Sequence, residues 1–93
     1  MSNNSYAIIV GDELFNETIY QYAHDIDSLK VKIISFIKEE QNKKFTQQFL
    51  DTSNNAVEEI LRGEIPLLSN KNEVLNKALF YDLDRYIYAK QIY

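Results

Sequence analysis

Apolar residues in the last quarter of the chain recur every three or four positions, which is the spacing of one helix face. This pattern predicts one long helix over residues 70–93, with Asn70 and Glu73 forming a capping box at its start. Two apolar stripes fall on opposite sides of this helix: Leu75, Leu79, Leu83, Tyr86 and Ile87 on one, and Val74, Ala78, Tyr81, Tyr88 and Ile92 on the other. A helix that is apolar on two sides needs cover on both.

Further helices are predicted ahead of it. Residues 12–24 begin with two acids, which a helix N-terminus favours, and carry a helical stripe of Leu14, Phe15, Thr18, Ile19, Tyr22 and Ile26. The next helix starts at Asp25 or Asp27 as N-cap and runs to about residue 42. The pattern resumes at 45–50 and is interrupted by turn-forming residues at 51–55. A capping box at Asn55 and Glu58 then starts a helix that Gly63 ends.

These segments predict an all-α fold, a small bundle of four to five helices with a long C-terminal helix, as a single helical domain over residues 1–93. The alternative is an α+β fold in which residues 6–10 form a short N-terminal strand. Residues 29–33 alternate with period two and also fit a strand. The length of that segment and the good helix formers at 38–44 favour a helix there.

Composition narrows the class of protein. The chain has no Cys, which excludes disulfides and thiolate metal sites and fits a cytoplasmic protein. Its longest apolar runs fall well short of the ~20 residues that span a bilayer, and its N-terminus lacks a signal-peptide pattern. The formal net charge of -4 disfavours non-specific binding to nucleic acid. We therefore expect neither membrane nor direct nucleic-acid binding.

No catalytic motif is found in the sequence. His24 is the single histidine, and a polar residue in the last turn of a helix accounts for it. There is no Gly-x-Ser-x-Gly motif, no pair of Glu-x-x-His motifs for a metal, and two glycines are too few for a Gly-rich phosphate loop. We therefore expect no enzyme, no cofactor and no metal.

Two contact surfaces are predicted instead. On the polar side of the helix at 12–24, the aromatic Tyr20 lies within an acidic rim, and this suits a protein partner with a basic surface. The expected partner-binding residues are Glu13, Asn16, Glu17, Tyr20 and His24. The outer stripe of the C-terminal helix predicts a homodimer seam, with Val74, Ala78, Tyr81, Arg85, Tyr88 and Ile92 at the oligomer interface.

The sequence therefore favours a small non-enzymatic protein-binding module. An inhibitor, immunity or regulatory protein of phage or mobile-element type, which acts by binding a host macromolecule, fits the size, the charge and a composition typical of AT-rich coding sequences. The alternative is a helical oligomer that binds a small polar or nucleotide ligand, with Tyr rings stacking on it and Lys residues neutralising phosphate.

Overall fold

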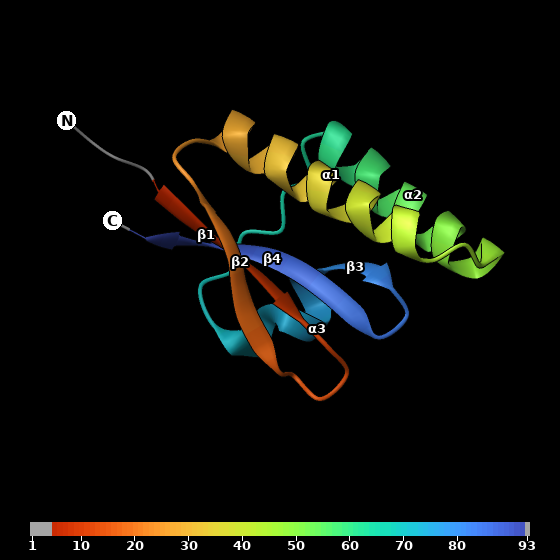
Figure 1. The fold of residues 1–93 in the computed structure, drawn as a ribbon. Helices are drawn as coiled ribbons and strands as arrows, with labels where there is room; N and C mark the ends of the chain where they lie inside the picture. Colours follow the sequence, from red (N-terminus) through yellow and green to blue (C-terminus); the bar gives the residue numbers. More distant parts are fainter. Residues whose placement is uncertain (1–4, 93) are drawn as a thin grey trace.

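The computed structural model describes residues 5–92 and has an α+β fold. Four strands, β1 (Ser5–Gly11), β2 (Glu17–Ala23), β3 (Leu79–Asp82) and β4 (Arg85–Ile92), form one antiparallel sheet in the order β2-β1-β4-β3 (Figure 1). The predicted all-α bundle is therefore wrong. The α+β alternative, with a strand at residues 6–10, has the observed fold class. Residues 1–4 and 93, which the predicted domain and the predicted last helix include, lie outside the described residues.

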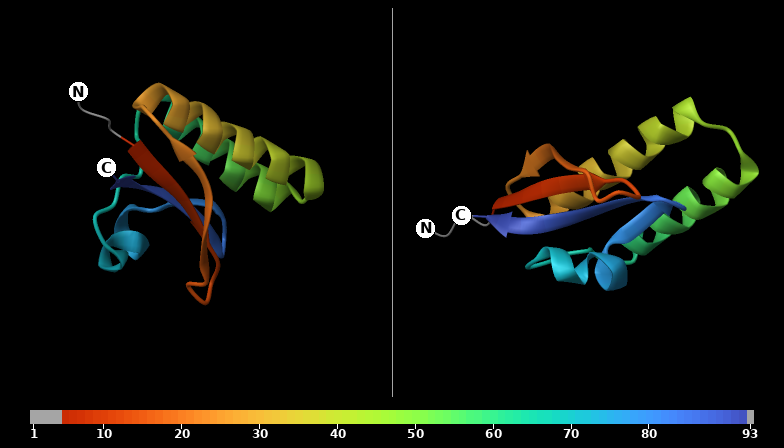
Figure 2. Two further views of the ribbon diagram at one scale, coloured as in Figure 1. Left: turned by 60° about the vertical axis from the view of Figure 1, so that its left-hand side comes forward. Right: turned by 90° about the horizontal axis from the view of Figure 1, so that it is seen from below.

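Two long helices, α1 (Ile26–Lys43) and α2 (Gln47–Leu61), form a hairpin over one face of the sheet (Figures 1 and 2). The prediction of a helix here with Asp25 as N-cap is confirmed, because the Asp25 carboxylate accepts a hydrogen bond from the Ser28 backbone N–H at 2.7 Å. The strand alternative for residues 29–33 is wrong, because α1 spans them. Leu29 and Ile33 lie on the buried face of this helix.

Helix α2 runs through the segment predicted as a break. The turn-forming residues 51–55 are accommodated because the buried Ser53 hydroxyl donates to the Phe49 carbonyl at 2.7 Å, within the helix itself. Gln41 of α1 in turn donates to the Ser53 hydroxyl and to the Asn54 side chain. The capping box predicted at residue 55 is therefore wrong. Gly63, with φ of 88°, follows the helix end as predicted.

The predicted helix at 12–24 is also wrong, since this segment is a loop followed by β2. A β-bulge explains the error. Ile8 pairs with Gln21 and Ile9 with Ile19, so Tyr20 is an extra residue in β2. Residues that lie three apart on either side of the bulge share a sheet face, and this hides the period of two that marks a strand.

The predicted helix at 70–93 is wrong as well. Asn70 does form its capping box with Glu73, but the chain then forms the short 3-10 helix η1 (Lys71–Glu73), the single turn α3 (Val74–Lys77) and the hairpin of β3 and β4. The alternating aromatic and aliphatic residues of β4 place Tyr86 and Tyr88 on one sheet face and Ile87 on the other. None of the helices in the described part of the chain has the length and apolar character needed to cross a membrane.

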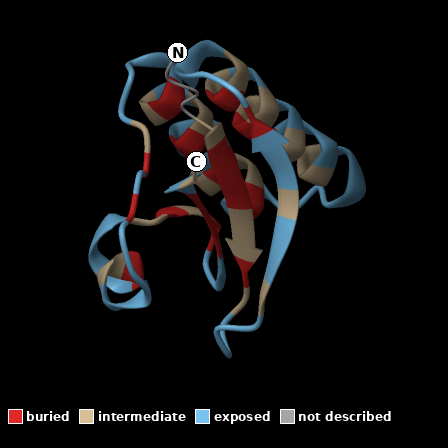
Figure 3. Cartoon of the chain, turned by 90° about the vertical axis from the view of Figure 1, so that its left-hand side faces the viewer, coloured by how far each residue is buried: buried red, intermediate tan, exposed pale blue. Residues whose placement is uncertain are grey.

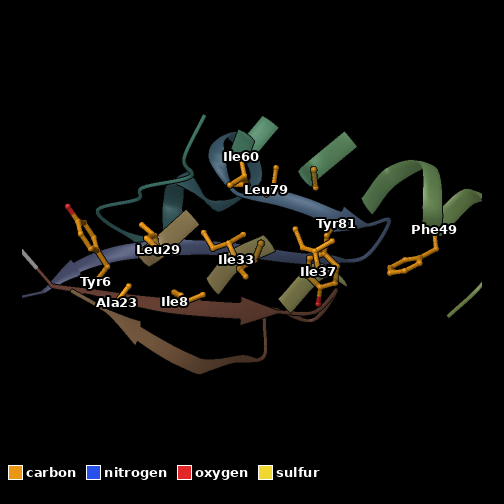
Figure 4. Packing of buried hydrophobic residues seen from close by; sticks show 13 residues of the cluster. Tyr6, Ile8, Ala23, Leu29, Ile33, Ile37, Phe49, Ile60, Leu79 and Tyr81 are labelled. Atoms are coloured by element: carbon orange, nitrogen blue, oxygen red, sulfur yellow. The ribbon is translucent and has the colours of Figure 1, made fainter. Parts of the chain in front are cut away.

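The two faces of the sheet are covered differently. The face under α1 and α2 holds the main core, a largely aliphatic cluster that includes Ile8, Ile33, Ile37, Ile60 and Ile87 (Figure 4). The opposite face, here called the second face, holds a smaller cluster of Leu68, Val74, Tyr86 and Tyr88 beneath η1 and α3. Strand β1 is largely buried, whereas the edge strand β2 is largely exposed (Figure 3).

Candidate functional site

The second face is built around the ring of Tyr86. Gly11 lies opposite Tyr86 in the pairing of β1 with β4, and opposite Glu17 in the pairing of β1 with β2. A Cβ added at Gly11 would lie 2.7 Å from Tyr86 Cε1 and closer still to its hydroxyl end. The absence of a side chain at this glycine therefore lets the Tyr86 ring lie across β1 and reach Glu17 on β2.

Glu17 joins the two tyrosines of the second face. Its carboxylate accepts hydrogen bonds from the Tyr86 hydroxyl at 2.7 Å and the Tyr88 hydroxyl at 3.0 Å, and the Lys71 ammonium lies 3.9 Å away. The two rings are stacked, with centroids 6.1 Å apart. Burial is the largest cause of the raised pKa values of both phenols, and the hydrogen bond to Glu17 is the second. The pKa of Tyr88 is raised to about 12, and that of Tyr86 is also strongly raised. Both phenols therefore stay protonated near neutral pH and act as donors to Glu17.

The loop between β1 and β2 is held by Asp12. Its carboxylate accepts hydrogen bonds from the backbone N–H groups of Leu14 at 2.9 Å and Asn16 at 3.1 Å, and these bonds lower the pKa of Asp12. Phe15, with φ of 60°, has a left-handed conformation that is uncommon for a bulky residue. Its ring lies 6.2 Å from that of Tyr86, centroid to centroid. The loop thus holds a strained residue in one defined position.

Three large apolar side chains, Phe15, Leu75 and Leu83, lie exposed around one pocket beside the β1–β2 loop, and we call them the end patch. Phe15 is 48% exposed, Leu75 70% and Leu83 67%. Phe15, Leu75 and Leu83 line an open pocket of about 170 Å³, together with Phe80 and Tyr86. A neighbouring pocket of about 320 Å³ lies between Phe15, Leu75 and the Glu17–Lys71 pair. Three separate segments, the β1–β2 loop, α3 and the β3–β4 turn, therefore meet in one apolar surface.

Two carboxylates border the end patch. Glu13, from the β1–β2 loop, and Asp84, from the β3–β4 turn, line the same pocket as Leu75 and Leu83. A hydrogen bond shared with Asp84 and the negative charge of Asp84 raise the pKa of Glu13. The positive charge of Arg85 opposes this shift to a smaller extent. We call Glu13 and Asp84 the acidic pair.

The predicted partner-binding residues lie at separate places in the structure. Glu13 and Glu17 line the pockets at the end patch, whereas Asn16 of the β1–β2 loop lines a different pocket with Phe36 and Tyr81. Tyr20 instead points to the helix-covered face, where its ring packs edge-on with that of Phe36, with the two centroids 4.9 Å apart. His24 follows β2, and its Nε2 atom lies 3.2 Å from the Oδ2 atom of Asp25. The five residues share no surface, because the helix that was to align them is a loop and a strand.

The predicted oligomer interface is dispersed for the same reason. Tyr81 is buried in the main core, whereas Val74, the first residue of α3, and Tyr88 are buried in the cluster of the second face. Ala78 packs against that second cluster, Arg85 is exposed at the start of β4, and Ile92 is half-buried at its end. The helical seam that would bring these six residues together is absent from the structure, because this segment forms strands.

The end patch itself was missed by sequence reasoning, which placed Phe15, Leu75 and Leu83 on helix stripes. A usable signal was present for Phe15. Asp12 and Asn16 are turn formers on either side of it, directly after the apolar run that ends at Gly11. An apolar residue within such a turn is exposed unless another element covers it.

Among residues 5–92, no three His, Asp or Glu side chains are arranged to hold a metal ion.

Comparison of the chain with protein families, curated proteins and solved structures finds no match. Its function is therefore inferred from its own geometry.

Proposed function

We propose that this chain is a small non-enzymatic binding protein that docks on another protein through the end patch. The observation that carries the proposal is the convergence of three large apolar side chains, 48–70% exposed, from three separate segments. Single exposed apolar residues are ordinary on protein surfaces, whereas grouped ones mark interaction sites. An inhibitor, immunity or regulatory role of phage or mobile-element type is consistent with this mode of action.

The β1–β2 loop supports the proposal. Ordering a flexible loop on binding costs conformational entropy, and a loop that is already fixed avoids that cost. Asp12 fixes the loop through three hydrogen bonds to Leu14 and Asn16. The strained φ of Phe15 is maintained by this bonding and by packing on Tyr86. Strain retained in an exposed loop is typical of binding sites.

The alternative of a stacked nucleotide ligand has less support. Three of the tyrosines that could stack on such a ligand, Tyr81, Tyr86 and Tyr88, are buried within the chain. The acidic pair at the end patch also repels phosphate.

The test compares two double variants that remove equally exposed apolar residues. Leu75→Ser/Leu83→Ser changes the end patch, and Leu61→Ser/Val31→Ser changes two residues of the helices that are 67% and 62% exposed. Immobilised wild type is incubated with a lysate of the organism that encodes it, and retained proteins are quantified by mass spectrometry. We expect a protein that the wild type and the helix variant retain and the end-patch variant loses, with melting temperatures close to that of the wild type. Equal retention by both variants would contradict the proposal.

A further inference from the structure

The border of the end patch determines which partners it fits. Like charges from two separate segments, Glu13 and Asp84, line the same apolar pocket. Neighbouring carboxylates repel each other, and a cation placed between them relieves the repulsion. Asp12, which lines the same pocket, adds a third negative charge. An apolar pocket and an anionic border therefore lie side by side at the surface.

We infer that the end patch takes a protein segment in which a large apolar side chain stands next to a lysine or arginine. The apolar side chain enters the pocket between Phe15, Leu75 and Leu83, and the cation lies between Glu13 and Asp84. This inference rests on the proposed function and specifies the chemistry of its partner. Apolar burial supplies most of the affinity, while the charges set orientation and rate of association.

Charge argues against the other kinds of occupant. Nucleic acid and anionic lipid headgroups are repelled by the acidic pair and by the net charge of -4. A second copy docked by a two-fold axis through this surface would set the acidic pair of one chain near that of the other, because such a contact uses the same surface on both chains. A basic protein segment meets neither obstacle.

The probe for this inference is a library of random linear peptides displayed on phage and selected against immobilised full-length protein. The most enriched peptide is then synthesised, and its affinity is measured for the wild type and three double variants. Glu13→Gln/Asp84→Asn removes the acidic pair and keeps the apolar pocket. Glu39→Gln/Glu58→Gln is the matched control, because it makes the same change in net charge at two exposed positions on α1 and α2. Leu75→Ser/Leu83→Ser removes the apolar side chains.

We expect selected peptides to carry a lysine or arginine within one helical turn of a large apolar residue. Affinity for Glu13→Gln/Asp84→Asn should fall about 3- to 10-fold at low salt, as for partly exposed ion pairs, and its dependence on salt should weaken. The matched control should bind like the wild type. The leucine variant should lose binding.

Different outcomes separate the two claims. Peptides that need Leu75 and Leu83 but bind equally to the wild type and to Glu13→Gln/Asp84→Asn would overturn the cationic partner and leave the proposed function standing. Peptides that bind the leucine variant as well as the wild type would overturn both, as would a selection that enriches no peptide. Sedimentation equilibrium tests the remaining occupant: a wild type that dimerises, with a monomeric leucine variant, would assign the patch to a second copy.

Discussion

The two faces of the sheet have different chemistry and different degrees of cover. The face under α1 and α2 is largely aliphatic, with Ile8, Ile33 and Ile87 fully buried between sheet and helices. The second face is aromatic, and its rings carry hydroxyls that bond Glu17. Among the residues that the structure describes, the connector around Leu68 and the short elements η1 and α3 cover it, and η1 and α3 lie over the β3–β4 side. Its open end carries the end patch.

This difference separates stability from recognition. A buried and largely aliphatic core contributes to folding in proportion to the apolar area that it buries. Aromatic side chains with polar tips suit a partly open surface, where the ring is packed and the hydroxyl needs a partner. Substitutions on the helix-covered face should therefore change stability alone, whereas those at the open end of the second face should change binding alone.

The largest effect is expected from Ile33→Ala. Ile33 is fully buried where α1 meets the sheet, and truncation leaves a cavity that the neighbouring side chains fill incompletely. The free energy of unfolding should fall by about 2–5 kcal/mol, measured by urea denaturation. Peptide binding by the folded fraction should be unchanged. A variant that stays as stable as the wild type would show that the helix-covered face is not the main source of stability.

A smaller loss is expected from Gly11→Ala on the second face. The added methyl group overlaps the Tyr86 ring, which has to move away from β1 and from Glu17. Overpacking of this kind typically costs about 1–3 kcal/mol. The double variant Gly11→Ala/Tyr86→Ala should lose less stability than the sum of the two single variants, because the ring that clashes is gone. Strict additivity in urea denaturation would rule out the clash.

Removal of the shared acceptor should have a comparable or smaller effect. In Glu17→Ala, the buried hydroxyls of Tyr86 and Tyr88 lose their hydrogen-bond partner, at a cost of about 1–3 kcal/mol in the free energy of unfolding. Glu17→Gln should cost less, because the amide oxygen still accepts one of the two bonds. Thermal or urea denaturation of the two variants gives this ranking. Equal losses would indicate that Glu17 contributes through the packing of its side chain and not through hydrogen bonding.

Alkaline pH weakens the same cluster through Tyr88. The pKa of its phenol is raised to about 12 in the folded chain by burial and by the bond to Glu17, from an ordinary value of 10.0. The unfolded chain therefore loses this proton first as pH rises, and the stabilisation, complete below about pH 10, is lost between about pH 10 and about pH 12. Urea denaturation should show a steeper loss of stability over this range in the wild type than in Tyr88→Phe. Identical slopes would contradict the role of this phenol.

The helix-covered face was the more predictable of the two. Helix α1 has a side-chain cap at Asp25, and its buried residues Leu29, Ile33 and Ile37 repeat every four positions, so a helix was favoured over the strand that residues 29–33 also fitted. The sequences of the strands fitted both helices and strands. In β2 the bulge at Tyr20 disturbs the alternation, and apolar residues then recur three apart, as they do in a helix. Pairing between β1 and β4, which are far apart in sequence, decides the structure there.

The candidate site was predicted in part, and for a reason that proved wrong. Glu13, Asn16 and Glu17 were grouped as neighbours on a helix, but they lie near one another because they follow directly along a loop and into β2. Asp84 and Leu83 could not be added, because their position beside Glu13 depends on the sheet order and not on local spacing. The two tyrosines that bond Glu17 are 69 and 71 residues away in sequence.

The smallest effect on stability is expected from Phe15→Asn, and it tests the comparison most directly. Asn tolerates a left-handed backbone better than Phe does, so the strain at φ of 60° is relieved by about 1 kcal/mol. The variant also loses the contact between Phe15 and Tyr86, but the ring is 48% exposed, so little buried area goes with it. These two changes oppose each other, and the melting temperature should stay close to that of the wild type.

Binding by Phe15→Asn should nevertheless be lost, because an apolar wall of the pocket is gone. Loss of a central aromatic anchor typically costs about 2 kcal/mol or more, roughly a 30-fold weaker affinity for the selected peptide in isothermal titration calorimetry. Val31→Asn, on an exposed position of α1, is the matched control and should bind like the wild type. If Phe15→Asn unfolds the chain, the ring belongs to the stabilising part of the second face. If it folds and binds unchanged, the strained loop has no part in recognition, and the separation between a stabilising face and a binding end does not hold.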